Sequence, residues 1–130
     1  AGYGFGWHNH DFEFKPLSDG SLPQDRIFEG GPGLEWEMDV AWVIRGGAAP
    51  LSWIEKYKDR ITAAHVKDIA PAGENKDEDG WSDLGYGTVD WKTIMAALKE
   101  IGVKHFVMEH DNPKDDGRFA TRSLASAKAL

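Results

Sequence analysis

Four side chains with metal-binding chemistry stand near the ends of separate apolar runs. They are His8, Asp39, His65 and Glu109, and the runs cover residues 2–10, 34–39, 61–65 and 104–109. Imidazole and carboxylate groups are ligands for Mn, Mg, Zn, Co and Fe(II). Because the ends of parallel strands meet at one edge of a sheet, the set predicts a single divalent-metal site.

Each of these residues also has an ordinary structural explanation. Asp39 precedes Val40 and could cap a helix or pair with a cation. His65 could be a core histidine with satisfied hydrogen bonds, and Glu109 an exposed charge at a strand end. We favour the metal site because Asp39, His65 and Glu109 end three different predicted strands.

The first strand offers a choice of ligand. His8 and His10 project to the same side, because alternate residues of a strand share a face. Glu13 is a third candidate beyond the expected strand end, and the whole segment could also be a polar turn. If one of the two histidines is the ligand, the other would contact the substrate.

A lysine and several tryptophans are candidate substrate contacts. Lys67 lies two residues after His65 and faces the same way, so its ammonium could hold a substrate oxygen or assist proton transfer. Alternatively, Lys67 pairs with Asp68. Tryptophans are more often core residues than ligand walls, but three could stack on a sugar ring: Trp7, Trp42 and Trp81.

The predicted elements alternate between strands and helices. Strands are expected over residues 2–10, 34–39, 61–66 and 103–109. Helices are expected from Pro50, from the N-cap Asp90 through Ile101, and over 119–130. Residues 15–33 and 69–90 are expected to be long loops, the first with at most a short helical turn at 25–29. This order predicts an α/β protein with parallel strands joined by crossovers.

Composition excludes several classes of protein. The 130 residues are 41% hydrophobic and 28% charged, as in globular domains, and there is no cysteine for a disulfide or thiolate site. A formal net charge of −7 argues against a nucleic-acid partner. No apolar stretch approaches the ~20 residues of a membrane span, and no signal peptide is visible, so the expected location is cytoplasmic.

Five motifs resemble the sugar phosphate isomerase/epimerase family, the xylose-isomerase-like TIM barrels. They are WHNHDFEF (7–14), EMDVAW (37–42), RITAAHVKD (60–68), LGYGTVDW (84–91) and VMEHD (107–111). The motifs cover nearly the whole chain in the family's order. The resemblance is specific to the superfamily and does not indicate a substrate.

The resemblance implies a divalent metal, most often manganese, at the ends of barrel strands five to eight. Asp39, His65 and Glu109 match the ligands of strands six, seven and eight, while His8 stands where glutamate is usual. Trp42 replaces a second histidine of the ketose epimerases, and Lys67 lies where their substrate-binding arginine is expected. Because only Glu109 remains of the usual glutamate acid/base pair, the resemblance leaves the chemistry open.

The resemblance also implies that residues 1–130 are one domain, half of a (β/α)8 barrel. The chain aligns with strands five to eight, so we expect two unpaired sheet edges and a bare apolar face. Such a half-barrel should be completed by a second copy in a homodimer or by a missing N-terminal half.

The leading hypothesis is therefore a metal-dependent sugar or polyol isomerase, epimerase or related lyase. Glu109, His10 or Lys67 would move the proton, with Trp7, Trp42 and Lys67 around the substrate. The alternative is a non-catalytic half-barrel, a fragment or a domain for assembly or ligand binding, that keeps the metal site. Phosphodiesterase action on DNA is disfavoured by net charge and by too few histidines for a trinuclear site.

Overall fold

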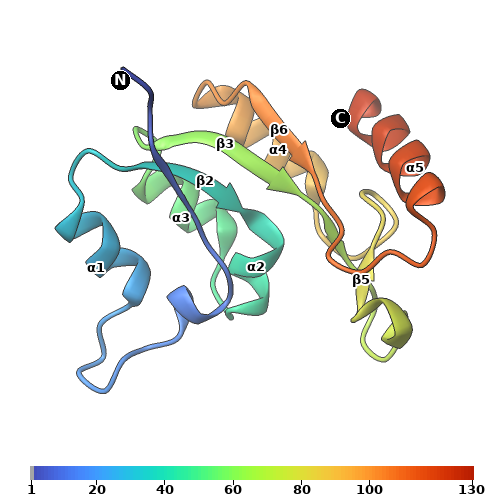
Figure 1. Cartoon of the computed structure of the whole chain (residues 1–130), viewed down its shortest axis with the longest axis horizontal. Coiled ribbons are helices and arrows are strands. Elements are labelled where there is room, and N and C mark those ends of the chain that lie inside the picture. The colour runs from blue at the N-terminus through green and yellow to red at the C-terminus, as the bar shows by residue number, and fades with distance from the viewer. Residues whose placement is uncertain (1) are drawn as a thin grey trace.

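Four parallel strands form the central sheet of the structure, a computed structural model that describes residues 2–130. In spatial order they are β1 (Gly6–His8), β2 (Glu35–Asp39), β3 (Ile61–Val66) and β6 (His105–Met108) (Figure 1). Each neighbouring pair is parallel, which requires crossover connections. The predicted α/β class and parallel order are confirmed, although β1 has three residues where a strand over residues 2–10 was expected.

Five α-helices accompany the sheet within residues 2–130. They are α1 (Pro23–Gly30), α2 (Val40–Arg45), α3 (Pro50–Lys56), α4 (Trp91–Glu100) and α5 (Asp116–Ala129). α4 begins after Asp90, as predicted, and the Asp90 side chain accepts a hydrogen bond from the backbone N–H of Thr93. α5 begins three residues before the predicted start, because Asp115 caps it through the backbone N–H of Arg118.

The segment 15–33 is more ordered than predicted. α1 occupies eight of its residues, beginning at Pro23, whose fixed φ and missing N–H suit the first turn of a helix. Phe28 on this helix is buried edge-on against Trp36 of β2, with ring centroids 5.5 Å apart. Tertiary packing therefore stabilises a short helix between segments rich in glycine and proline.

The segment 69–90 also contains structure that the sequence did not predict. β4 (Asp68–Ile69) and β5 (Trp81–Ser82) pair antiparallel, and a 3-10 turn, η2 (Lys76–Glu78), lies between them. The buried Asp68 carboxylate accepts hydrogen bonds from the backbone N–H groups of Gly85 and Val89. One buried side chain thus fixes the return of the chain from β5 toward α4.

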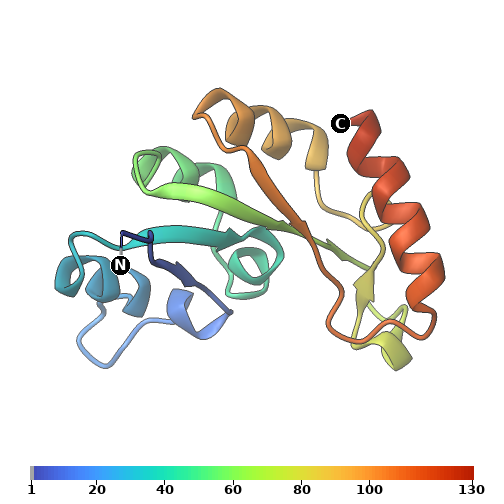
Figure 2. The same cartoon turned by 45° about the horizontal axis from the view of Figure 1, so that its top comes forward.

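The apolar core lies between the sheet and its helices. Trp36 and Met38 of β2 are fully buried on the helical face, and Ala64 and Val66 of β3 join them. The helices add apolar side chains to this core: Phe28, Val43, Trp53, Ile94 and Leu98. α5 lies beside the β4–β5 hairpin at one end of the molecule, where Ser123 accepts a hydrogen bond from Leu84 N–H (Figures 1 and 2).

The opposite face of the sheet is polar, in contrast to the apolar face that was expected. Glu35 and Glu37 alternate with the buried Trp36 and Met38 along β2, so they project away from the helices. His105 of β6 is exposed on the same side. The expectation came from the missing strands one to four of the barrel that the resemblance implies, whereas the buried apolar residues of β2 and β3 face the helices.

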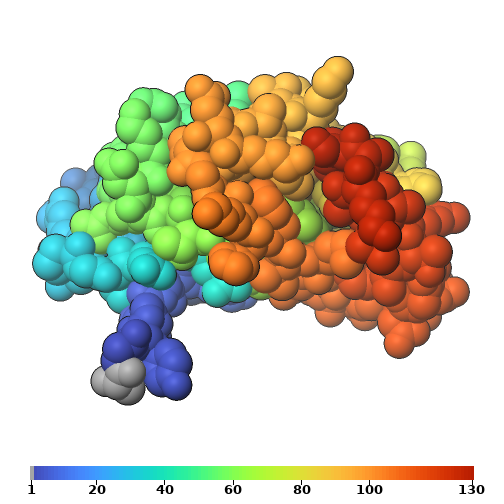
Figure 3. Space-filling view, turned by 90° about the horizontal axis from the view of Figure 1, so that it is seen from above, coloured from blue at the N-terminus to red at the C-terminus, as the bar shows by residue number. Residues whose placement is uncertain are grey.

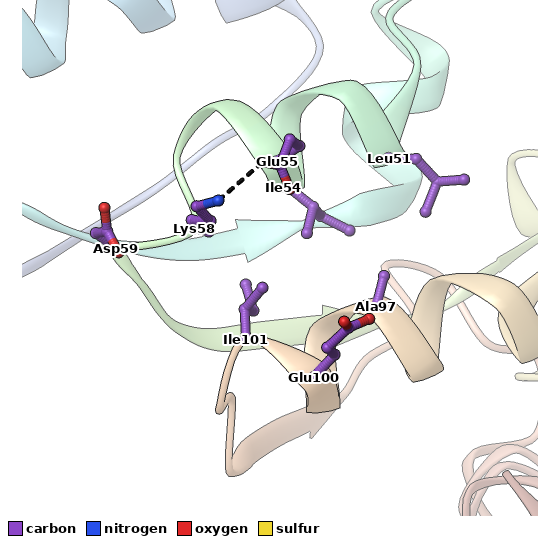
Figure 4. A pocket seen from close by; sticks show the side chains of 8 residues that line it. All are labelled: Leu51, Ile54, Glu55, Lys58, Asp59, Ala97, Glu100 and Ile101. Carbon is purple, nitrogen blue, oxygen red and sulfur yellow. Dashed lines mark hydrogen bonds and ion pairs between the residues drawn. The ribbon is translucent and has the colours of Figure 1, made fainter.

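The structure has two further surface features. A cavity of about 500 Å³ separates α3 from the end of α4, with Leu51, Ile54 and Ile101 among its walls (Figure 4). The N-terminal segment stands out from the body of the molecule (Figure 3), and Tyr3 is 91% exposed. Among the described residues, no helix combines the length and apolar character that crossing a membrane requires.

Candidate metal centre

The four predicted ligands come together at the carboxyl ends of the parallel strands. His8 and Asp39 are the last residues of β1 and β2, His65 is next to last in β3, and Glu109 follows β6. One potential ligand atom from each lies within 4.8 Å of the others. In the register of the sheet Asp39 is opposite His65, so these two side chains project together from adjacent strands.

The cluster is a compact set of two imidazoles and two carboxylates. His65 Nδ1 lies 2.6 Å from Glu109 Oε2 and 4.0 Å from Asp39 Oδ2, and His8 Nε2 lies 3.3 Å from the same Asp39 oxygen. Nitrogen and oxygen donors in these proportions suit Mn²⁺, Fe²⁺, Co²⁺ or Zn²⁺. The donor set therefore fits a divalent metal ion.

Asp39 caps a helix and also belongs to the cluster. Its Oδ1 accepts a hydrogen bond of 3.0 Å from the backbone N–H of Trp42 and so caps α2, while its Oδ2 faces the cluster. The carboxylate is completely buried. The helix cap thus orients the oxygen that faces the other ligands.

Asn9 connects β1 to β2 beneath the cluster, a role that the sequence analysis missed. Its buried Oδ1 accepts hydrogen bonds from the backbone N–H of Asp39 and the indole N–H of Trp36, both at 2.9 Å. Its Nδ2 donates to the Asp39 carbonyl at 3.1 Å. A buried asparagine with donor and acceptor both satisfied fixes His8 relative to Asp39.

The three candidates of the first strand occupy different environments. His8 belongs to the cluster. The His10 ring is beside it, 5.0 Å from that of His8 and 5.3 Å from that of Trp42. Glu13 is fully buried and accepts hydrogen bonds from the Trp7 indole N–H and the His10 backbone N–H. The structure therefore brings His8, and neither His10 nor Glu13, into the ligand set.

Lys67 is buried against the same carboxylates. Its Nζ lies 3.0 Å from Asp39 Oδ2, 3.2 Å from Glu109 Oε2 and 2.8 Å from Asp111 Oδ2. Burial disfavours the ammonium, but the attraction of Asp39 and Asp111 outweighs it and raises the pKa of Lys67. Lys67 is therefore a fixed positive charge behind the cluster, with no exposed surface for direct contact with solvent.

The pKa values of His65 and Glu109 are coupled through their short contact. Hydrogen bonding to His65, opposed by burial and helped by Lys67, lowers the pKa of Glu109 to about 2. Burial disfavours the His65 imidazolium, but hydrogen bonds to Glu109 and Glu37 outweigh it, so the pKa of His65 is raised. Glu109 would thus offer a metal an anionic ligand, whereas the imidazolium form of His65 would compete with the metal.

The predicted aromatic walls lie on different sides of the sheet. Trp7 faces the helical side and packs against the core. Trp42 lies beside His10 and, like Trp81, has its ring near the Lys67 ammonium, at 5.0 and 4.6 Å. Trp42 and His10 are therefore the aromatic groups next to the cluster, and Trp7 is separated from it by the sheet.

Glu37 is a further partner of the cluster that the sequence analysis missed. Its Oε1 lies 2.7 Å from His65 Nε2, the ring nitrogen that points away from Glu109. The signal was present in the sequence, because Glu37 is two residues before Asp39 and shares its face of β2. The contact itself depends on the register between β2 and β3, which the sequence does not show.

Known proteins resemble this chain in sequence and in structure. No protein-family model matches the chain. An inosose dehydratase of Klebsiella pneumoniae is 30% identical over 101 residues, covering 68% of this chain and 32% of the relative. The chain thus spans about a third of the length of this curated relative.

Solved structures of sugar-isomerase-like proteins match a larger part of the chain than the sequence relative does. A sugar phosphate isomerase/epimerase from Parabacteroides distasonis superposes with a TM-score of 0.71 at 25% identity, over 97% of this chain and 44% of its own. A xylose isomerase domain protein from Planctomyces limnophilus gives a TM-score of 0.68 at 23% identity, over 99% and 45%. The resemblance seen in the motifs is confirmed: the chain is related in fold to the sugar phosphate isomerase/epimerase and xylose-isomerase-like proteins, with an inosose dehydratase among its relatives in sequence.

Proposed function

We propose that the protein binds a divalent metal ion, manganese in the first place, and acts on a small sugar or polyol as an isomerase, epimerase or related dehydratase. The observation that carries the proposal is the convergence of His8, Asp39, His65 and Glu109, one from the end of each parallel strand, within 4.8 Å. The similarity to a sugar phosphate isomerase/epimerase and to an inosose dehydratase supports the substrate class.

Each residue around the cluster has a distinct proposed task. His8, Asp39, His65 and Glu109 would hold the metal, which when bound polarises a substrate carbonyl or hydroxyl. The buried Lys67 ammonium balances the negative charges of Asp39 and Glu109. With Lys67 buried, we no longer propose it as a direct substrate contact.

His10 is the best placed of the three predicted proton carriers. The low pKa of Glu109 makes its carboxylate a weak base, and the raised pKa of Lys67 makes its ammonium a weak acid. His10 lies beside His8 without belonging to the ligand set, and imidazole is the group that most often transfers protons near neutral pH. We therefore propose His10 as the proton carrier between substrate and solvent.

An aromatic surface next to His10 suits the apolar face of a sugar ring. Phe12 stacks with the His10 ring at a centroid distance of 6.0 Å and is 56% exposed, and the Trp42 ring lies 5.3 Å from that of His10. Carbon-bound hydrogens of a sugar can pack on such rings while its hydroxyls face the polar cluster. We propose Trp42 and Phe12 as the substrate-binding walls.

Solvent isotope exchange tests this function. The Mn²⁺-loaded protein is incubated in D₂O with a panel of ketoses and inososes, and proton NMR follows exchange next to the carbonyl. We expect exchange with at least one substrate, and a loss of about 10²-fold or more in His10→Gln. His105→Gln is the matched control, because His105 is an exposed histidine of the same sheet outside the ligand set.

Two results would contradict the proposed chemistry. The first is a metal-loaded protein that exchanges no hydrogen in any substrate of the panel, and the second is an unchanged rate in His10→Gln. Metal binding without exchange would favour the second candidate function, a non-catalytic domain that retains the metal centre. The specific observation behind that candidate is that the chain spans 44% of the Parabacteroides distasonis structure.

A further inference from the structure

Glu37 and the proposed metal centre hold opposite sides of one imidazole ring. His65 Nδ1 faces Glu109 Oε2 at 2.6 Å, and His65 Nε2 faces Glu37 Oε1 at 2.7 Å. The ring therefore lies between two carboxylates, one on β2 and one directly after β6. Only the Nδ1 side lies near Asp39 and the rest of the ligand set.

The sheet brings Glu37 to His65 through its register. Glu37 pairs with Ala63, and Asp39 pairs with His65. Because Ala63 carries only a methyl group, the imidazole of His65 can lean back along the sheet toward Glu37. The register shift between Trp36 and Glu37 places Glu37 in this position.

We propose that Glu37 is a positioning residue of the metal centre: its carboxylate accepts the Nε2 hydrogen of His65 and so keeps the Nδ1 lone pair directed at the metal. This inference rests on the proposed function, because it requires that His65 is a ligand. A histidine ligand commonly donates its second N–H to a carboxylate, which fixes both the tautomer and the ring orientation. Nothing in this role requires Glu37 to touch the metal or the substrate.

A neighbouring glutamate separates this role from a general effect of negative charge. Glu35 lies two residues earlier on β2 and projects from the same face. Its Oε2 is 3.3 Å from the Thr62 hydroxyl, and it has no hydrogen bond to His65. Glu35→Ala therefore removes the same charge from the same strand face without removing the contact between Glu37 and His65.

The experiment measures Mn²⁺ affinity by isothermal titration calorimetry in four proteins: wild type, Glu37→Ala, Glu37→Gln and Glu35→Ala. We expect Glu37→Ala to bind Mn²⁺ about 10- to 100-fold more weakly. We expect Glu37→Gln to recover most of the affinity, because its amide oxygen can accept the same hydrogen bond. Glu35→Ala should bind as wild type does.

A second measurement reports which nitrogen of the His65 ring carries a proton. Long-range ¹⁵N–¹H spectra of the Zn²⁺-loaded protein distinguish a protonated ring nitrogen from one bound to metal. Wild type and Glu37→Gln should show His65 with a protonated Nε2 and a metal-bound Nδ1. Glu37→Ala should show mixed ring states.

The outcomes separate the inference from the proposed function. If wild type binds no metal, both are overturned. If wild type binds metal but Glu37→Ala matches wild type in affinity and in its His65 spectrum, the inference alone is overturned. Equal losses in Glu37→Ala and Glu35→Ala would also overturn it, because the effect would then be one of charge.

Discussion

Asp39 shows how a single residue can serve the fold and the candidate site together. One carboxylate oxygen caps α2, and the other lies 3.0 Å from Lys67 Nζ and 3.3 Å from His8 Nε2. Burying this charge is unfavourable unless it is paired, and Lys67 supplies the pair. Opposite charges in contact likewise lower the pKa of Glu109 and raise the pKa of His65, so the candidate site favours the carboxylate form of Glu109 and the imidazolium form of His65.

Metal affinity should therefore increase with pH in the range set by His65. The pKa of this residue is raised above its ordinary value of 6.5, so the imidazolium competes with the metal below the raised pKa. As pH rises toward that pKa, affinity should increase by up to about tenfold per pH unit and then level off. Glu109 is already ionised and adds nothing to this slope.

Calorimetric titrations with Mn²⁺ between about pH 6 and about pH 9 check this dependence. Repeating them in buffers of different ionisation enthalpy also measures the proton released on binding. His105→Gln should give the same profile as wild type, since His105 is exposed and outside the cluster. An affinity that does not change across the range would contradict the assignment of His65 as a protonated ligand.

Among the elements, strands were easier to predict from the sequence than short helices and hairpins. The strand positions followed from apolar runs and the start of α4 from Asp90, because these signals are local. α2 was missed because it follows β2 directly, with Asp39 ending the strand and capping the helix. The β4–β5 pairing was missed because only two residues of each strand take part and their contact is non-local.

The packing around Asp68 gives a test at the level of the hairpin. A side chain at Gly87 would collide with the Asp68 carboxylate and the Ile69 carbonyl. Gly87→Ala should therefore lower the free energy of unfolding by about 1–3 kcal/mol, measured by urea denaturation. Gly33→Ala is the matched control, because an added Cβ there meets nothing within 4 Å and Gly33 has no positive φ. Equal stability of the two variants would show that the loop does not pack closely on Asp68.

Viewed as a whole, the molecule has one face covered by helices and one polar face with the candidate metal centre at its edge. β1 and β6 are the outer strands of the described sheet, and the chain covers 44% of the Parabacteroides distasonis structure. We propose that a second copy or an N-terminal half pairs with these strands.

The convergence of the four side chains was predictable from the sequence, and their supporting contacts were not. His8, Asp39, His65 and Glu109 were identified because strand-end ligands can be read from local patterns. The roles of Asn9 and Glu37 depend on which residues face each other across β1, β2 and β3. That register is a property of the folded sheet.

The most direct test of the central claim is a Mn²⁺ titration of the metal-stripped protein and two aspartate variants. We expect wild type to bind about one Mn²⁺ per chain and Asp39→Asn to bind it at least about 100-fold more weakly. Asparagine can still cap α2, so the fold should be retained. Asp90→Asn is the matched control, because Asp90 also caps a helix but lies outside the cluster, and it should bind as wild type does. Wild-type affinity in Asp39→Asn would show that the cluster is not the metal centre.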